Sequence, residues 1–216
     1  IEIPLPPIEI QEQIVKEIEG YQQIIDGCRQ VVENYKPMID IDPSWKTIRL
    51  QDTFKNPKQD IVDGPFGSNL KSSEYLDKIE VPIIRLQNID RYNFINKNIK
   101  YISKTKAEIL SRHNFKYGDI VMTKLGKPLG KACLVPVEMG SGIIVADIVR
   151  LRVDKSKTLR EFILYVLNSE LVIKQLMIHT KGATRPRINL NVIRNLTIPF
   201  PKIDTQKEIV EKLEQE

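Results

Sequence analysis

Four loop-rich stretches of this 216-residue chain combine small residues with cationic or amide side chains, at residues 63–73, 85–91, 123–131 and 181–189. Glycine and serine let backbone amides approach a phosphate, while Lys, Arg, Asn and Gln suit phosphates and the hydrogen-bonding edges of bases. The sequence therefore predicts a nucleic-acid interface that includes Ser68, Asn69, Lys71, Arg85, Asn88, Arg91, Lys124, Lys127, Lys131, Lys181, Thr184, Arg185, Arg187 and Asn189.

The fourth stretch contains two arginines that flank a proline. Pro186 stiffens a loop between Arg185 and Arg187, and two guanidinium groups held in this way can fork onto guanine edges or phosphates. The alternative for Arg185 is an ion pair with a carboxylate inside the same domain. A Gly-Lys turn is also typical of a solvated hairpin tip, so each stretch taken singly is a weak signal.

Patterns typical of enzymes are missing or incomplete. Asp42-Pro43-Ser44-Trp45 has Ser where an adenine methyltransferase motif has a second Pro, and no Asp or Glu is followed two residues later by Lys, as in common metal-dependent nucleases. Residues 126–131 fail the P-loop spacing, and His113 and His179 stand alone. We therefore expect this chain to have no catalytic residue, no metal site and no bound cofactor.

Composition sets the broad class of the protein. A hydrophobic content of 41% over this length is enough for one ordinary core. Cys28 and Cys133 are too few for a disulfide framework, and neither a signal peptide nor an 18-residue apolar run is present. We expect a soluble, cytoplasmic protein that does not enter a membrane.

The elements that must position the four loops form an α+β pattern. Apolar runs bounded by Gly, Pro, Asn or Asp predict strands at residues 81–86, 119–123, 132–136 and 142–153. Helical patterns cover residues 104–111 and 158–178, the second interrupted at Asn168-Ser169. The prediction is a mixed α+β domain with an irregular sheet, flanked by long coiled-coil helices.

The sequence at the start of the chain is repeated at its end. Residues 3–19 align with residues 198–214, and eight of these 17 pairs are identical. Both copies read as an extended Pro-x-Pro segment followed by a charged amphipathic helix. We expect one period of a larger repeating architecture and, since no initiator Met is present, a fragment. The predicted divisions are an entry and spacer helix at 1–40, a recognition domain at 41–202 and the start of a second spacer helix at 203–216.

The helix of the first copy carries a narrow apolar seam with alternating steps of four and three residues. Its members are Ile14, Ile18, Tyr21, Ile25, Cys28, Val32 and Tyr35. Such a heptad stripe favours an antiparallel partner helix over a broad core, although packing on the chain's own domain is the alternative. The second copy is cut after 13 residues, too short to cover the seam, so we expect a homodimer through the first helix.

Charge is distributed unevenly along the chain. Residues 37–203 hold 28 Lys and Arg against 16 Asp and Glu, a surplus of 12, whereas segments 8–36 and 204–216 each carry a net charge of −3. A surplus of this size on one domain favours a polyanionic partner, most often nucleic acid. The same surplus disfavours a scaffold that holds only proteins.

Several motifs resemble one family in order and spacing. They are Gly64-Pro65-Phe66-Gly67-Ser68, Ile83-Ile84-Arg85 followed by Asn88-Ile89, Gly118-Asp119-Ile120-Val121, Gly182-Ala183-Thr184-Arg185, and Ile198-Pro199-Phe200-Pro201 before a charged helix. Together they resemble the specificity subunit of type I restriction-modification systems. That subunit usually carries two target recognition domains, each reading one half of a split DNA site, held apart by long antiparallel helices.

This resemblance implies a function and a set of partners. It implies that the chain binds double-stranded DNA and directs separate modification and restriction subunits, which would carry S-adenosylmethionine, ATP and Mg²⁺. The alternative is the C-terminal recognition region of a single-chain adenine-specific methyltransferase and restriction enzyme. The sequence leaves open whether the native protein is a half-size subunit, a fragment of a two-domain subunit or the tail of a fused enzyme. It also leaves open which DNA sequence is read.

Overall fold

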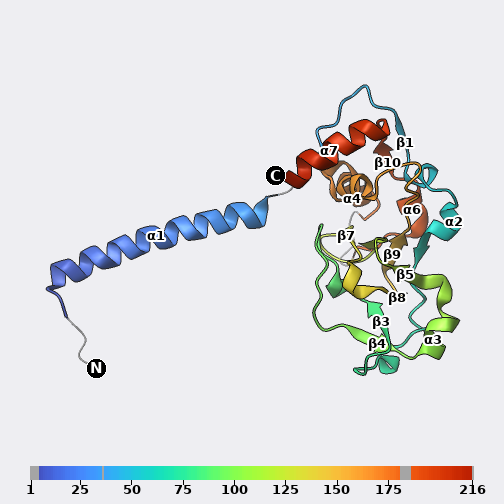
Figure 1. Ribbon diagram of the computed structural model, residues 1–216, viewed down its shortest axis with the longest axis horizontal. Coiled ribbons are helices and arrows are strands. Elements are labelled where there is room, and N and C mark those ends of the chain that lie inside the picture. Colours follow the sequence, from blue (N-terminus) through green and yellow to red (C-terminus); the bar gives the residue numbers. More distant parts are fainter. Residues whose placement is uncertain (1–4, 36, 181–185, 216) are drawn as a thin grey trace. The chain divides into compact units, whose positions relative to one another are not determined.

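The computed structural model describes residues 5–35, 37–180 and 186–215 (Figure 1). The chain divides into a helical unit, Ile1–Pro37, and a globule, Met38–Glu216. The helical unit contains α1 (Ile8–Asn34), whose 27 residues make a rod of about 40 Å. The helix ends two residues before the Lys36-Pro37 position predicted from the proline, and the Tyr35 N–H donates to the Val31 carbonyl at 2.8 Å.

The predicted seam follows α1 and is open to solvent. Ile14, Ile18, Tyr21 and Ile25 are 46–60% exposed, and Cys28 is exposed as well. Tyr35 comes directly after the last helical residue, and the side chain of Val32 lies outside the described residues. Four large apolar side chains this exposed on one helix leave apolar surface that a partner helix could bury.

The globule is an α+β domain, as predicted. Its described residues form ten short strands: β1 (Thr47–Arg49), β2 (Ile61–Asp63), β3 (Val81–Ile84), β4 (Lys100–Ile102), β5 (Asn114–Lys116), β6 (Ile120–Thr123), β7 (Ala132–Leu134), β8 (Ser141–Ile144), β9 (Ile148–Leu151) and β10 (Thr197–Pro199). The helices are α2 (Pro57–Asp60), α3 (Lys104–Ile109), α4 (Arg160–Asn168), α5 (Glu170–Ile178), α6 (Leu190–Arg194) and α7 (Ile203–Gln215).

Three sheets organise these strands within the described residues. An antiparallel sheet has the order β2-β9-β6-β7, a mixed sheet has the order β4-β3-β8-β5 with β3 parallel to β8, and β1 pairs with β10. In Figure 1, α4 and α7 lie at one end of the globule, β3 and β4 lie at the other end, and β7 and β9 lie between them.

The β2-β9-β6-β7 sheet is buried on both faces and joins two hydrophobic clusters. Along β6, Ile120 and Met122 belong to the cluster with the helices, while Val121 between them belongs to the cluster with the mixed sheet. A strand covered on both faces needs a continuous apolar run, which explains the sequence Ile120-Val121-Met122. Cys133 on β7 is fully buried, and this burial raises the pKa of its thiol to about 12.

The predicted interruption of the long helical stretch is confirmed. Helix α4 ends at Asn168 and α5 begins at Glu170. The buried Asn168 amide accepts from the Ala132 N–H at 3.1 Å and donates to the Ala132 and Leu164 carbonyls at 2.9 and 3.1 Å. This side chain therefore ties the helix break to the edge strand β7, and leaving its partners unpaired would be costly.

The second copy of the repeat packs on the globule. Its helix α7 buries Gln206, Val210 and Leu213, and the Gln206 Oε1 accepts from the Thr158 hydroxyl at 2.7 Å and from the Leu159 N–H at 3.1 Å. Residues 203–215, predicted as the start of a second spacer helix, thus belong to the globule's compact unit. The predicted divisions at residues 40 and 203 stay predictions of domain organisation.

The two copies share one local contact. The Gln206 Nε2 donates to the Pro201 carbonyl at 3.0 Å, and the aligned Gln11 Nε2 donates to the Pro6 carbonyl at 2.7 Å. Their apolar neighbours differ, because Val210 is 7% exposed whereas the aligned Val15 is 52% exposed. The repeat therefore encodes the same turn into a helix in both places, and within the globule the second copy is covered by the core.

Candidate nucleic-acid interface

The structure brings the third and fourth predicted stretches together through their backbones. The Lys124 carbonyl accepts from the Ile188 N–H at 3.0 Å, and the Gly126 N–H donates to the Pro186 carbonyl at 3.2 Å. The Lys124 N–H in turn donates to the Asp147 carbonyl at 2.7 Å. Residues 123–131 and 186–189 consequently form one continuous structure with the turn between β8 and β9.

The first stretch joins the same structure. The Gly64 N–H donates to the Ile148 carbonyl at 2.9 Å, so the loop leaves β2 against the start of β9. The Asp63 carboxylate then pairs with the Lys124 ammonium at 2.8 Å. This ion pair is largely shielded at its cationic end, because only 10% of the Lys124 side chain is exposed.

The second stretch borders the third. The Lys131 ammonium pairs with the Asp90 carboxylate at 2.9 Å. Another pocket of the globule has a volume of about 420 Å³. The pocket between the second and third stretches has a volume of about 330 Å³. The latter is lined from both stretches by Gln87, Ile89, Thr123 and Lys127, among others. We call residues 63–73, 85–91, 123–131 and 186–189 the four-loop surface.

Three of the predicted cationic ligands have an internal carboxylate partner. Lys124 pairs with Asp63, Lys131 with Asp90, and the Arg187 Nε donates to the Asp147 carboxylate at 2.6 Å. The hydrogen bond from Lys131 holds the pKa of Asp90 below its ordinary value. A phosphate that approaches these cations must compete with carboxylates, so they contribute less to non-specific attraction than their number implies. The pairing expected as the alternative for Arg185 is thus found at Arg187.

Asp147 contacts two residues of the four-loop surface, Lys124 and Arg187, and sequence reasoning missed it. Residues 142–153 were predicted as one strand, but the structure has two strands in different sheets, β8 and β9, separated at residues 145–147. Asp147 has a φ of 67°, a left-handed conformation that costs a non-glycine residue on the order of 1–3 kcal/mol. Its contacts with Lys124 and Arg187 hold this turn in place. The one signal in the sequence that could have identified Asp147 is its carboxylate, a group that pairs with Lys and Arg side chains.

The burial of Asn88 corrects its predicted role. Its side chain is 0% exposed, and its amide accepts from the Arg85 N–H and donates to the Ile95 and Lys97 carbonyls, each at 3.0 Å. The Arg85 guanidinium donates to the Asn98 carbonyl. Asn88 is inaccessible from the surface and shapes the second loop from within, because these three partners are backbone groups of that loop and the segment after it.

The other predicted residues divide by position. The Asn189 side chain accepts from the Val192 N–H at 2.9 Å and caps α6, so at least one of its polar atoms is already engaged. Arg91 is half-buried. Among the predicted residues of the four-loop surface, the exposed ones are Ser68, Asn69, Lys71, Lys127, Arg187 and Asn189. The predicted residues Lys181, Thr184 and Arg185 lie outside the described residues.

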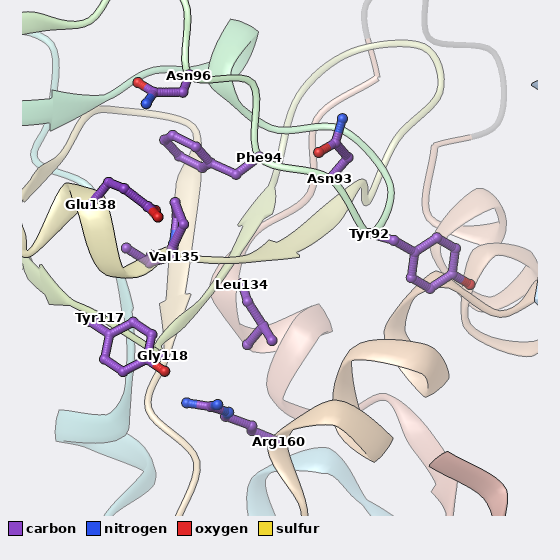
Figure 2. Close-up of a pocket in the computed structure, with 11 residues that line it drawn as sticks. Tyr92, Asn93, Phe94, Asn96, Tyr117, Gly118, Leu134, Val135, Glu138 and Arg160 are labelled. Atoms are coloured by element: carbon purple, nitrogen blue, oxygen red, sulfur yellow. The ribbon is translucent and has the colours of Figure 1, made fainter. Parts of the chain in front are cut away.

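The pocket of about 420 Å³ shares no lining residue with the four-loop surface (Figure 2). The Arg160 guanidinium lies over the Tyr117 ring, 5.6 Å from its centroid, and the Arg160 Nε donates to the Glu161 carboxylate at 2.5 Å. That hydrogen bond raises the pKa of Arg160. In this pocket the Arg160 guanidinium is already paired with Glu161 and rests on the Tyr117 ring, and we assign the pocket no ligand.

No three or more His, Cys, Asp and Glu side chains in residues 5–35, 37–180 and 186–215 are grouped so that they could hold a metal ion. Among the helices of the same ranges, none combines the length and the apolar character needed to cross a membrane.

An α+β domain with cationic loops gathered on one surface defines a candidate nucleic-acid-binding module. Residues 44–215 match the family model described as the type I restriction modification DNA specificity domain. The chain belongs to this family, as the sequence motifs had suggested.

Curated relatives are specificity subunits from Methanocaldococcus jannaschii. The chain is 24% identical to the type I restriction enzyme MjaVIII specificity subunit, over 99% of this chain and 54% of that protein. It is 22% identical to the putative type I restriction enzyme MjaX specificity subunit, over 84% of this chain and 42% of that protein. The chain therefore spans about half the length of the curated relatives it matches.

Solved structures share the fold. The HsdS subunit from Thermoanaerobacter tengcongensis gives a TM-score of 0.55 at 21% identity, over 99% of this chain and 52% of that one. A chain from a study of type I restriction-modification assembly gives 0.60 at 21% identity, over 99% and 53%. The type IIG restriction endonuclease BpuSI gives 0.54 at 11% identity, over 79% and 26%.

Proposed function

We propose that the globule is a target recognition domain that reads one half of a bipartite DNA site through the four-loop surface. The observation that supports this most is the convergence of four loops, far apart in the sequence, on a domain segment with a charge surplus of 12. Exposed Lys71 and Lys127 would meet phosphates, and Ser68, Asn69 and Arg187 would reach base edges or phosphates.

The proposed role is that of a specificity component without a catalytic site of its own. Modification and restriction subunits would supply S-adenosylmethionine, ATP and Mg²⁺ chemistry, and the complex would act in the cytoplasm. Family membership and the specificity-subunit relatives support this role. They favour it over the recognition region of a single-chain enzyme, because the likeness to BpuSI is one of fold at 11% identity.

We further propose that two chains pair through α1. The exposed seam supports this, since an antiparallel pair of such helices would bury Ile14, Ile18 and Ile25. A two-fold dimer would carry one globule at each end of a rod of about 40 Å, longer than one turn of B-form DNA. It would therefore read a palindromic split site.

Selection of bound duplexes from a random-sequence pool tests the proposed reading of DNA. The full chain should enrich a short fixed sequence, present as two inverted copies at constant spacing if the dimer forms and as a single copy if it does not. Enrichment of no sequence after repeated rounds, with duplex binding intact, would reduce the globule to a non-specific binder and contradict the proposal.

Asp147→Asn should strengthen non-specific binding. The change removes the carboxylate that pairs with Arg187, and Asn tolerates the left-handed backbone as well as Asp does. Affinity for random-sequence duplex should rise severalfold, and the slope of log affinity against log salt should steepen by about 1. Fluorescence anisotropy titrations at several salt concentrations measure both quantities.

The matched control for this change is Asp77→Asn. It adds the same charge outside the four-loop surface, at an exposed carboxylate paired with Lys100. Equal effects of the two substitutions would mean that only net charge matters and that Arg187 does not lie at the DNA interface.

A further inference from the structure

The most exposed aromatic side chain among the described residues lies at the tip of the first loop of the four-loop surface. Phe66 is 83% exposed, and the residues that follow it, Gly67, Ser68 and Asn69, are exposed as well. Single exposed apolar residues are ordinary on protein surfaces. This one lies at the edge of the proposed DNA surface, where a bound duplex would contact it.

The base of this loop is held firmly while its tip projects. Gly64 lies so close to the turn between β8 and β9 that a Cβ atom there would come within 1.9 Å of the Val145 carbonyl oxygen. Pro65 and Leu70 are buried on either side of the tip, and the Asn69 N–H donates to the Phe66 carbonyl at 2.8 Å, which closes a turn. The backbone therefore presents the Phe66 ring from a fixed position. Because the loop is already held in place, less conformational entropy is lost when a ligand binds to it.

The same contacts attach the loop to the cationic part of the surface. Asp63, the residue before Gly64, pairs with Lys124, and the turn that Gly64 touches includes Asp147, the partner of Arg187. The Phe66 loop thus belongs to the same connected group of loops as Lys124 and the proposed DNA ligand Arg187. Polar Ser68, Asn69 and Lys71 flank it and suit a phosphate backbone.

We propose that Phe66 is a wedge that inserts between two stacked base pairs when the globule binds DNA. This inference rests on the proposed function and adds a specificity-determining residue to it. An apolar side chain that enters a base step exchanges contact with water for contact with base faces, and it partly unstacks and kinks the duplex. Since pyrimidine–purine steps are the easiest to unstack, the wedge selects TA, CA or TG at its position without hydrogen bonds to base edges.

The test uses the full chain and duplexes that carry its selected sequence, with 2-aminopurine placed in turn at each base step. Wild-type protein should raise the fluorescence at one step, because unstacking relieves quenching of the base. Phe66→Ala should abolish that rise and weaken binding by about tenfold, within the range found for the loss of one stacking contact. Phe66→Trp should keep both the rise and the affinity.

Ile79→Ala removes another side chain of similar exposure, 78%, outside the four loops, and should change neither quantity. Unchanged fluorescence and affinity in Phe66→Ala would overturn the wedge while leaving the proposed function intact. The wedge would equally be overturned if Phe66→Ala bound DNA normally and lost only co-purification with a modification subunit. Failure of the wild-type chain to bind any duplex would instead remove the proposed function and the wedge together.

Discussion

Raising the salt concentration from about 50 to about 200 mM should lower the affinity of this chain for duplex DNA by about a thousandfold. The expectation follows from the charge surplus of 12 in residues 37–203 and assumes that about six phosphates are neutralised, each releasing condensed counterions. Titrations of a labelled duplex at four or more salt concentrations give the slope. A slope near zero would contradict an interface made mainly with phosphates.

The internal ion pairs refine this expectation. Lys124, Lys131 and Arg187 are already paired with carboxylates, so the neutralised phosphates must be met largely by other, exposed cations such as Lys71 and Lys127. Lys127→Ala should then reduce the slope by about 1 and weaken binding to all sequences alike. A change confined to one base position would instead place Lys127 at a base edge.

Ile18→Glu together with Ile25→Glu should abolish dimerisation through α1. Each substitution places a carboxylate at the centre of the proposed seam, where burial of an unpaired charge costs several kcal/mol. Light scattering at micromolar concentration should give twice the 25.0 kDa chain mass for the wild type and the single chain mass for the variant. A wild-type mass of one chain would leave the seam without the proposed partner.

A matched control keeps the added charge and moves it off the seam. Gln13→Glu with Gln23→Glu adds two carboxylates at exposed positions of α1 that are not among the seam residues, and dimerisation should persist. Cys28 offers a second readout, because it is exposed in one chain and would be covered in the dimer. Alkylation of Cys28 should therefore be faster in the glutamate seam variant than in the wild type, while the buried Cys133 should stay unmodified in both.

Local patterns in the sequence were enough for several elements. The heptad stripe and Pro37 placed α1 and nearly its last residue, and Asn168-Ser169 marked the break between α4 and α5. Strands β3, β6 and β7 fell within predicted runs. These successes share a cause: helix periodicity, prolines and continuous apolar runs act over a few neighbouring residues, so the information is local.

Short strands were less accessible to the same reasoning. Strands β1, β2, β4, β5 and β10 have three residues each, too few to show an alternation, and they exist because a neighbouring strand pairs with them. The turn at residues 145–147 interrupts an apolar run that reads as one strand, because β8 and β9 pair in different sheets. Pairing partners of this kind are chosen by the whole fold.

The sequence by itself determined the family, the α+β class, the charge surplus and the four stretches that would form one surface. Only the tertiary structure decided the state of each side chain there. It paired Lys124 with Asp63, 61 residues away, and Arg187 with Asp147, 40 residues away, and it buried Asn88. It also placed the helix of the second repeat on the core of the globule, where Val210 and Leu213 are buried. The physical reason is that electrostatic pairing and burial depend on distances in space, which residues far apart in the chain acquire only when the whole domain packs.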